Sequence, residues 1–252
     1  MLTQPLLDKL TQLRLPAFRA ALEEQLHNPQ YTELPFEDRL GLLVDRECIR
    51  RDNNRLQRRL RAARLPLPAT VEDLDLSPSR GIDRRLVLQL AQGEWISRHL
   101  NILILGPTGV GKTFLASALA HSACRHNFTV RYLRASRLLH QTSLAHADGS
   151  YPKLLDTFAR VQLLVLDDWL RDPLTRTQSQ DLLEILDDRY ARSSTMVATQ
   201  VPVAEWHVRF PDPTIGDAIL DRLVHNAYRL NLKGESRRKI NSPLDHADHL
   251  SV

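Results

Sequence analysis

The sequence predicts an α/β fold in which helices cover both faces of a parallel sheet, a three-layer α/β/α arrangement, preceded by a small all-helical N-terminal domain. Beyond residue 80, short and fully apolar runs alternate with helical stretches, as expected for a parallel sheet buried on both faces. Before residue 66, apolar residues recur only at the three- and four-residue spacing of helices. The 252 residues are 42% hydrophobic and 25% charged, a composition that excludes disorder as the dominant state.

The N-terminal domain, residues 1–66, is predicted to form three or four helices. Pro16, Pro29 and Pro35 divide its helical periodicity into segments. The last predicted helix, about Phe36 to Ala63, carries a dense run of positive charge in its C-terminal half. Residues 46–64 hold eight arginines against two acids, a local net charge of +6 in a chain whose total is +4. Charge this concentrated bears on the partners of the protein.

Residues 67–79 are predicted to link the two domains, because the stretch 65–79 holds three prolines, no basic residue and no sustained periodicity. The second domain, residues 80–252, then alternates helices and strands. We expect helices at 80–97, 114–124, in stretches that end near 160, at 177–192 and at 215–226, with strands at 102–105, 129–133, 162–166, 196–199 and 228–232. Ligands of such a sheet bind at the carboxyl ends of its strands.

A glycine loop follows the first predicted strand and precedes an apolar helix. It reads glycine, four residues, then Gly-Lys-Thr, which is the phosphate-loop pattern in its required context. Its glycines let backbone N–H groups converge on a β-phosphate, its lysine extends along the β- and γ-phosphates, and its threonine hydroxyl coordinates Mg²⁺. The pattern predicts ATP and Mg²⁺ as cofactors. The expected nucleotide-binding residues are Gly106, Pro107, Thr108, Gly109, Val110, Gly111, Lys112, Thr113 and Phe114.

An apolar strand that ends in two acids, about fifty residues downstream, supplies the second half of such a site. Asp167 is expected to hold Mg²⁺ together with Thr113, and Asp168 to orient or deprotonate the attacking water. The alternative for Asp168 is a cap of the following loop. The side chain that would activate the water here is an aspartate, which is one methylene shorter than a glutamate in the same role. Either the attacking water therefore sits closer to the end of the strand, or hydrolysis is slow. Thr199 and Gln200 end a later strand, where they either fix the attacking water or are plain loop residues.

Four segments in order resemble a known family. GPTGVGKTFLASALA, LLVLDDW, VATQVPVAEWH and AILDRLVHNAYRLNLKGESRRK are similar to segments of the IstB-like ATP-binding proteins, helper ATPases encoded beside insertion-sequence transposases. These proteins are related to the bacterial replicative helicase loader and to the replication initiator, within the AAA+ class of P-loop ATPases. The resemblance covers about residues 80–240 through specific motifs and the N-terminal domain more loosely.

The resemblance implies a role for each matching position. It places the phosphate loop in the Walker A motif and the two acids in the Walker B motif, with ATP bound between subunits of a homo-oligomer. Where the family often has glycine after Walker B, this chain has Trp169 and Leu170. An arginine stabilises the charge on a transferring phosphoryl group, in cis or from a neighbour. The implied catalytic residues are Asp168 of Walker B, Gln200 at the sensor-1 position with Thr199 beside it, Arg222 as the arginine finger offered to the next subunit, and Arg238 as the sensor-2 arginine in cis.

The arginine-rich helix supports binding of duplex DNA. Several of its arginines are spread over about 20 Å along the helix axis, at a rise of ~1.5 Å per residue. Duplex DNA presents one phosphate charge per ~1.7 Å along its own axis, so the two charge densities are comparable. Such a stripe binds DNA without reading bases, and its alternative is a solvated or partner-facing helix. The resemblance implies a second DNA surface on the extra helices between the strand at 129–133 and Walker B, which match the insertion that distinguishes the initiator and loader branch. The expected DNA-binding residues are Arg51, Arg55, Arg58, Arg59, Arg134, Arg137 and Lys153.

Three functions follow from these patterns. The first is an ATP-dependent transposition helper that assembles on duplex DNA and recruits a transposase encoded alongside. The second is a helicase-loader-type protein acting on a replicative helicase, which the arginine run favours less. The third, a small-molecule kinase, is disfavoured because such kinases usually carry an arginine-rich lid and need no arginine from a neighbour. We expect a cytoplasmic protein without membrane contact, since no run approaches ~18 consecutive apolar residues and no export signal is visible.

Overall fold

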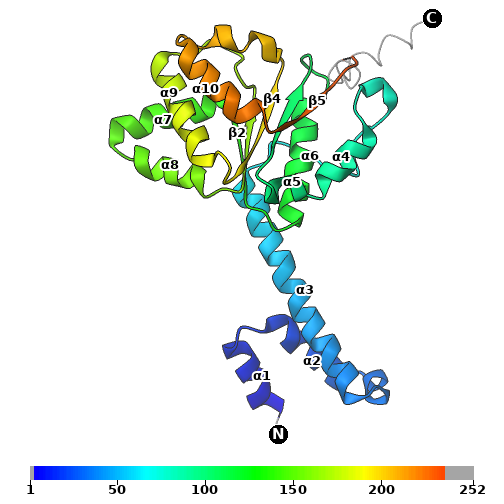
Figure 1. Cartoon of the computed structure of the whole chain (residues 1–252). Helices are drawn as coiled ribbons and strands as arrows, with labels where there is room; N and C mark the ends of the chain where they lie inside the picture. The colour runs from blue at the N-terminus through cyan, green and yellow to red at the C-terminus, as the bar shows by residue number, and fades with distance from the viewer. Residues whose placement is uncertain (1–2, 236–252) are drawn as a thin grey trace, which may run out of the picture. The chain divides into compact units, whose positions relative to one another are not determined.

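The computed structural model describes residues 3–235 of the chain (Figure 1). The chain divides into two compact units, residues 1–58 and residues 59–252, and each is described by itself. The division falls inside a long helix, so the boundaries at 66 and 80 remain a prediction. No helix among the described residues has the length and apolar character that crossing a membrane requires.

The first unit is helical, as its periodicity predicts. It contains helices α1 (Thr3–Gln12) and α2 (Pro16–His27), the 3₁₀ helix η1 (Pro29–Glu33) and most of helix α3 (Phe36–Ala63). Prolines stand in the first turns of α2 and η1, where the missing N–H costs no helical hydrogen bond. The buried side chains are few, and the charged Glu47 is one of them; the others are Leu7, Leu10, Ala21, Gln25 and Leu43.

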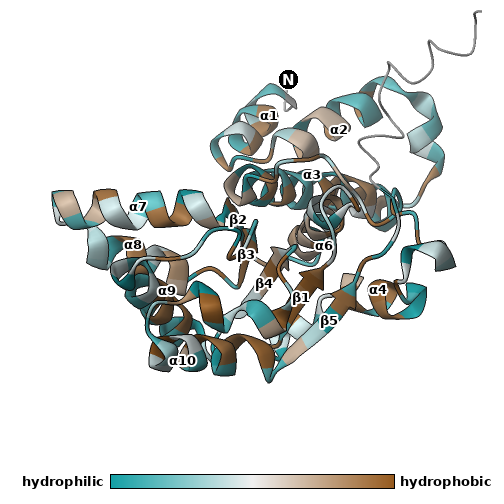
Figure 2. Cartoon of the chain, turned by 90° about the horizontal axis from the view of Figure 1, so that it is seen from above, coloured by the Kyte–Doolittle hydropathy of each residue, from teal (hydrophilic) through white to brown (hydrophobic). Residues whose placement is uncertain are grey.

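The second unit is built on a five-stranded parallel sheet, which confirms the predicted fold class. Its strands are β1 (Asn101–Leu105), β2 (Val130–Arg134), β3 (Leu163–Asp167), β4 (Ser194–Thr199) and β5 (Ala227–Asn231), in the order β2-β3-β4-β1-β5. Every residue of β3 and β4 is buried. Figure 2 shows hydrophobic residues along β1, β3 and β4, as expected for central strands covered on both faces.

Helices cover both faces of the sheet (Figure 1). On one side lie η2 (Pro78–Arg80), α4 (Arg84–Ala91), α5 (Glu94–Ser97) and α6 (Lys112–Arg125). On the other side lie α7 (Ala135–Asp148), α8 (Tyr151–Ala159), α9 (Arg176–Arg189) and α10 (Pro213–Val224), with the 3₁₀ turns η3 (Val203–Glu205) and η4 (His207–Arg209) before α10. Helices α7 and α8 are the two extra helices expected between the second and third strands.

The single helix predicted at 80–97 is wrong. The chain forms η2, then α4 from Arg84, then the separate turn α5. Asp83 caps α4 by accepting a hydrogen bond from the Arg85 N–H. Gly93 has φ +79°, a left-handed conformation through which an α-helix cannot continue. A Cβ at this position would lie 2.8 Å from the Phe128 ring, so only glycine fits there.

Candidate active site

The phosphate loop lies between β1 and α6, at the carboxyl end of the central strand. Gly111 precedes α6 with φ +100°, a backbone conformation that favours glycine. A Cβ on Gly106 would lie 2.5 Å from the Leu232 carbonyl oxygen, so only glycine fits beside that segment. The Lys112 ammonium donates hydrogen bonds to the carbonyls of Gly106 and Pro107, at 2.8 Å each. The lysine therefore lies across the loop that is expected to hold the phosphates.

The structure brings Thr113 and Asp167 together, although 53 residues separate them in the sequence. The Thr113 hydroxyl donates to the Asp167 carboxylate at 2.8 Å, and the Tyr132 hydroxyl donates to the same oxygen at 2.7 Å. Burial, followed by the charge of Asp167, raises the pKa of Tyr132, so this phenol stays a donor. A hydroxyl and a carboxylate beside a phosphate loop are the hard oxygen ligands that Mg²⁺ prefers, and this donor set fits the ion.

Asp168 lies at the rim of the same pocket. Its side chain is 44% exposed, and its carboxylate is 3.7 Å from the Arg134 guanidinium, at the end of β2. Its φ is +54°, and its N–H donates to Asp167 at 2.9 Å. The carboxylate is thus open to water and faces the pocket. Arg134, for which the sequence suggested a DNA contact, lines this pocket and pairs with the acid expected to activate water.

The two sensor-1 candidates differ in what their side chains contact. The Gln200 side chain lines the pocket and accepts a hydrogen bond from the Thr108 hydroxyl of the phosphate loop. Thr199 is 1% exposed, and its hydroxyl donates to the Trp169 carbonyl at 2.6 Å and accepts from the Val201 N–H at 3.0 Å. Gln200 can therefore meet a ligand, whereas the Thr199 hydroxyl is occupied by the backbone.

Trp169 anchors the turn after the two acids. Its ring is 1% exposed and meets the Trp206 ring edge-on, with centroids 6.0 Å apart. The backbone N–H of Trp169 donates to the Ala198 carbonyl at 3.0 Å. The residues on either side of it, Asp168 and Leu170, have φ of +54° and +51°. This buried anchor holds Asp168 in a backbone conformation that is unusual for residues other than glycine.

The pocket at this site has a volume of about 670 Å³, and part of its wall was missed by sequence reasoning. Residues from the predicted linker contribute an apolar side, and Arg80 and Ile82 continue it toward Leu232. The contributing linker residues are Leu67, Leu74, Asp75 and Leu76, with Pro66 just before them. A larger hollow of about 820 Å³, between residues 71–78 and α4, contains none of the predicted site residues.

The two candidate phosphate-stabilising arginines lie outside this pocket or outside the described residues. Arg222, on α10, pairs with Asp187 on α9 and donates to the Ala218 carbonyl at 2.8 Å. It lines a separate small hollow and contributes nothing to the wall of its own phosphate pocket. Arg238 lies outside the described residues.

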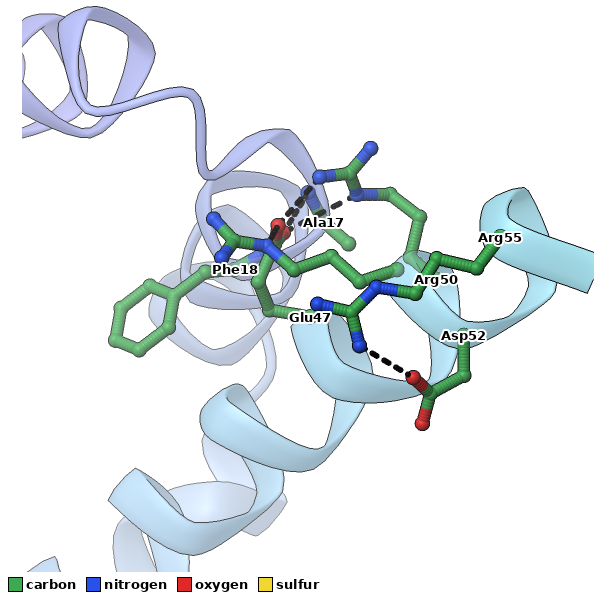
Figure 3. Close-up of polar contacts among 7 residues, drawn as sticks. Ala17, Phe18, Glu47, Arg50, Asp52 and Arg55 are labelled. Atoms are coloured by element: carbon green, nitrogen blue, oxygen red, sulfur yellow. Dashed lines mark hydrogen bonds and ion pairs between the residues drawn. The ribbon is translucent and has the colours of Figure 1, made fainter. Parts of the chain in front are cut away.

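All four predicted DNA-binding arginines on α3 have hydrogen-bond partners within the protein, and Arg51 is the one held by a buried acid. Figure 3 shows Glu47, a residue of α3, reaching the first turn of α2. There its carboxylate accepts hydrogen bonds from the backbone N–H groups of Ala17 and Phe18 at 3.0 and 3.3 Å. Arg50 and Arg51 also donate to it. The Arg50 hydrogen bond, aided by Arg51 and the two N–H groups, lowers the pKa of Glu47 to about 2. Glu47 therefore stays ionised and holds Arg51 against its own unit.

The remaining candidates are more accessible. Arg55 pairs with Asp52 at 3.2 Å with both side chains well exposed, and such a pair opens at little cost. Arg58 is exposed and donates to the Asn54 carbonyl, whereas Arg59 donates to the carbonyl of Cys124 on α6. The insertion residues Arg137 on α7 and Lys153 on α8 are exposed as well.

Comparison with known proteins first defines the fold. The parallel sheet with its covering helices has the same fold as two solved structures, DnaA and DnaI. The chain superposes on AMPPCP-bound DnaA from Aquifex aeolicus with a TM-score of 0.57 at 18% identity, covering 70% of this chain and 54% of that one. It superposes equally on DnaI, with a TM-score of 0.57 at 19% identity, over 66% and 92% of the two chains.

Within that fold the chain belongs to the IstB-like ATP binding protein family, whose sequence profile matches residues 8–244. It is 47% identical to the insertion sequence ATP-binding protein y4pL of Sinorhizobium fredii, over 95% of this chain and 98% of that protein. It is 31% identical to the IS21 ATP-binding protein of Pseudomonas aeruginosa, over 91% and 86%. The chain is thus an ATP-binding protein of the insertion-sequence type, and the expected family is confirmed.

Proposed function

We propose that this protein is a transposition helper that binds ATP and Mg²⁺ at subunit interfaces, assembles on duplex DNA and recruits a transposase encoded alongside. The observation that carries the proposal is the contact of Thr113 with Asp167 beside the phosphate loop, in a chain whose relatives are named for insertion sequences. Those two residues would hold Mg²⁺, which would neutralise charge on the β- and γ-phosphates when bound.

The residues of the chain divide the remaining work of hydrolysis. The backbone amides of the phosphate loop and Lys112 bind and orient the triphosphate. Asp168 accepts a proton from the attacking water, and Gln200, which lines the same pocket, helps to orient that water. Arg222 lies outside its own pocket, and to reach the phosphates of a neighbouring subunit its guanidinium exchanges the ion pair with Asp187 for them.

DNA binding is proposed for the exposed positive charges. Arg55 and Arg58 on α3, with Arg137 and Lys153 on the insertion, contact phosphates without reading bases. Sequence-tolerant contact of this kind suits an element that inserts at many targets.

The test compares ATP turnover of the purified chain alone, with duplex DNA and with its transposase. Duplex stimulation together with ATP-dependent assembly on DNA supports the proposal. Stimulation only by a replicative helicase or by single-stranded DNA would replace it with the helicase-loader function, and DNA-independent phosphotransfer to a small molecule would indicate a kinase. Lys112→Ala is the matched negative control, since it removes nucleotide binding and should abolish turnover under every condition.

A further inference from the structure

Arg80 is a buried cation at the phosphate loop that belongs to none of the motifs above. The residue is 9% exposed, and its guanidinium donates to the carbonyl of Val110, in the middle of the loop. Within residues 3–235 its contacts include no ion pair with a carboxylate. A guanidinium has five N–H donors, so one carbonyl leaves most of them unused.

Arg80 is held in place from two sides. Its backbone carbonyl accepts a hydrogen bond from the Lys233 N–H at 2.9 Å, which ties it to the segment after β5. Its guanidinium lies against two glycines. A Cβ built on Gly111 would be 3.3 Å from the Arg80 Nη2 atom, and a Cβ built on Gly234 would be 3.1 Å from the Arg80 Nη1 atom. The group therefore fills the space between the phosphate loop and the end of the sheet.

The position of Arg80 relates it to the nucleotide. It lines the same pocket as Lys112, Thr113 and Leu232. Removing a charge from water is costly unless an opposite charge compensates it. The carboxylates of Asp75, Asp167 and Asp168 line the same pocket, but within residues 3–235 the side-chain contact of Arg80 is with the Val110 carbonyl and not with a carboxylate. The phosphate chain of a nucleotide is the anion that this pocket is built to receive.

We propose that Arg80 is a nucleotide-binding residue whose guanidinium supplies positive charge to the bound phosphate chain while it holds the Val110 carbonyl of the loop. The proposal deepens the ATP-binding function and rests on it. A purely structural brace would make the same hydrogen bond to Val110, but it would stabilise the protein whether or not nucleotide is bound. The two roles therefore differ in the stability of the nucleotide-free chain.

The experiment uses the full chain with Arg80→Met, Arg80→Lys and the control Arg85→Met, an exposed arginine on the neighbouring helix α4. Dissociation constants for ATP and ADP are measured by calorimetry at several salt concentrations, and thermal midpoints with and without nucleotide. We expect Arg80→Met to raise the dissociation constants of both ATP and ADP by about 10-fold or more, as the loss of a charge-assisted hydrogen bond implies. We expect its nucleotide-free midpoint to stay level or rise, because a buried unpaired cation is gone. Arg80→Lys should recover most of the affinity.

Two results would overturn the proposal. The first is equal nucleotide affinity in Arg80→Met and Arg85→Met. The second is a lower thermal midpoint of nucleotide-free Arg80→Met together with an unchanged shift of that midpoint on adding ATP, because Arg80 would then be a structural brace only. If Arg80→Met does not fold, Arg80→Gln decides, because glutamine removes the charge but keeps an N–H donor for the Val110 carbonyl, and it should lower nucleotide affinity in a stable chain. If the wild type and Arg85→Met also bind no nucleotide, the ATP-binding function itself fails, a result distinct from the failure of Arg80 alone.

Discussion

Replacing Glu47 by glutamine should loosen helix α2 from helix α3 in the first unit. The carboxylate is 6% exposed and accepts from two α2 N–H groups and from the guanidiniums of Arg50 and Arg51. A glutamine keeps the shape but presents an NH₂ group to arginine donors. Hydrogen bonds to charged groups contribute about 1.5–3 kcal/mol each, so we expect a loss of about 3 kcal/mol, since one oxygen still accepts. That is a factor of about 100 in the opening equilibrium of α2.

The assay is native-state hydrogen exchange of the α2 amides in the full chain at neutral pH, where protection should fall by about two orders of magnitude. The control is Glu23→Gln, whose carboxylate forms an exposed pair with Arg19 and should change protection little. Because the pKa of Glu47 is lowered to about 2, its stabilisation is fully present above about pH 4.5 and disappears as the pH falls through 2. Unchanged α2 protection in Glu47→Gln would refute the assignment of Glu47 as the connection between these helices.

Three further predictions concern function. Arg222→Ala should leave ATP affinity within about threefold of wild type and remove DNA-stimulated hydrolysis, measured as phosphate release; unchanged turnover would contradict its role as the finger. Asp168→Asn should slow hydrolysis by about 10²-fold or more while ATP still binds, as a lost general base implies, and a smaller effect would point to a loop cap. Replacing Arg55, Arg58 and Arg59 together by serine should weaken binding to all duplex sequences alike and lower the slope of log K against log salt by up to about 2.7 units; a sequence-dependent loss would argue against phosphate contact.

The elements that the sequence predicts best are those whose pattern depends on burial alone. The five strands lie within two residues of their expected positions. The central strands β1, β3 and β4 must be apolar on both faces, and the edge strands β2 and β5, although partly exposed, still keep apolar residues that mark them. The phosphate loop and its acid were found because spacing and chemistry are local in each. The helix at 80–97 failed because Gly93 adopts a left-handed conformation, which the apolar periodicity around it conceals.

The rest of the site could not be predicted because it depends on long-range contacts. Proline-rich residues 67–79 carry the composition of a linker, yet several of them line the nucleotide pocket. Nothing in the local sequence distinguishes Arg80, which reaches Val110 across 30 positions, from the other arginines. Arg134 pairs with Asp168 only because β2 and β3 are neighbours in the sheet. Thr199 and Gln200 are adjacent in sequence, but long-range contacts give them different surroundings. The Thr199 hydroxyl bonds to backbone groups, whereas the Gln200 side chain lines the pocket.

The placement of the aromatic rings gives the protein a natural optical reporter. All three tryptophans, Trp95, Trp169 and Trp206, belong to the second unit, and Trp169 lines the pocket beside the catalytic acid. Emission excited at the indole band is therefore blind to the helical N-terminal unit. A spectral change on adding DNA to the unlabelled chain would report a change in the ATPase unit, where Arg137 and Lys153 are proposed to contact DNA, and its time course could be followed without attaching a dye.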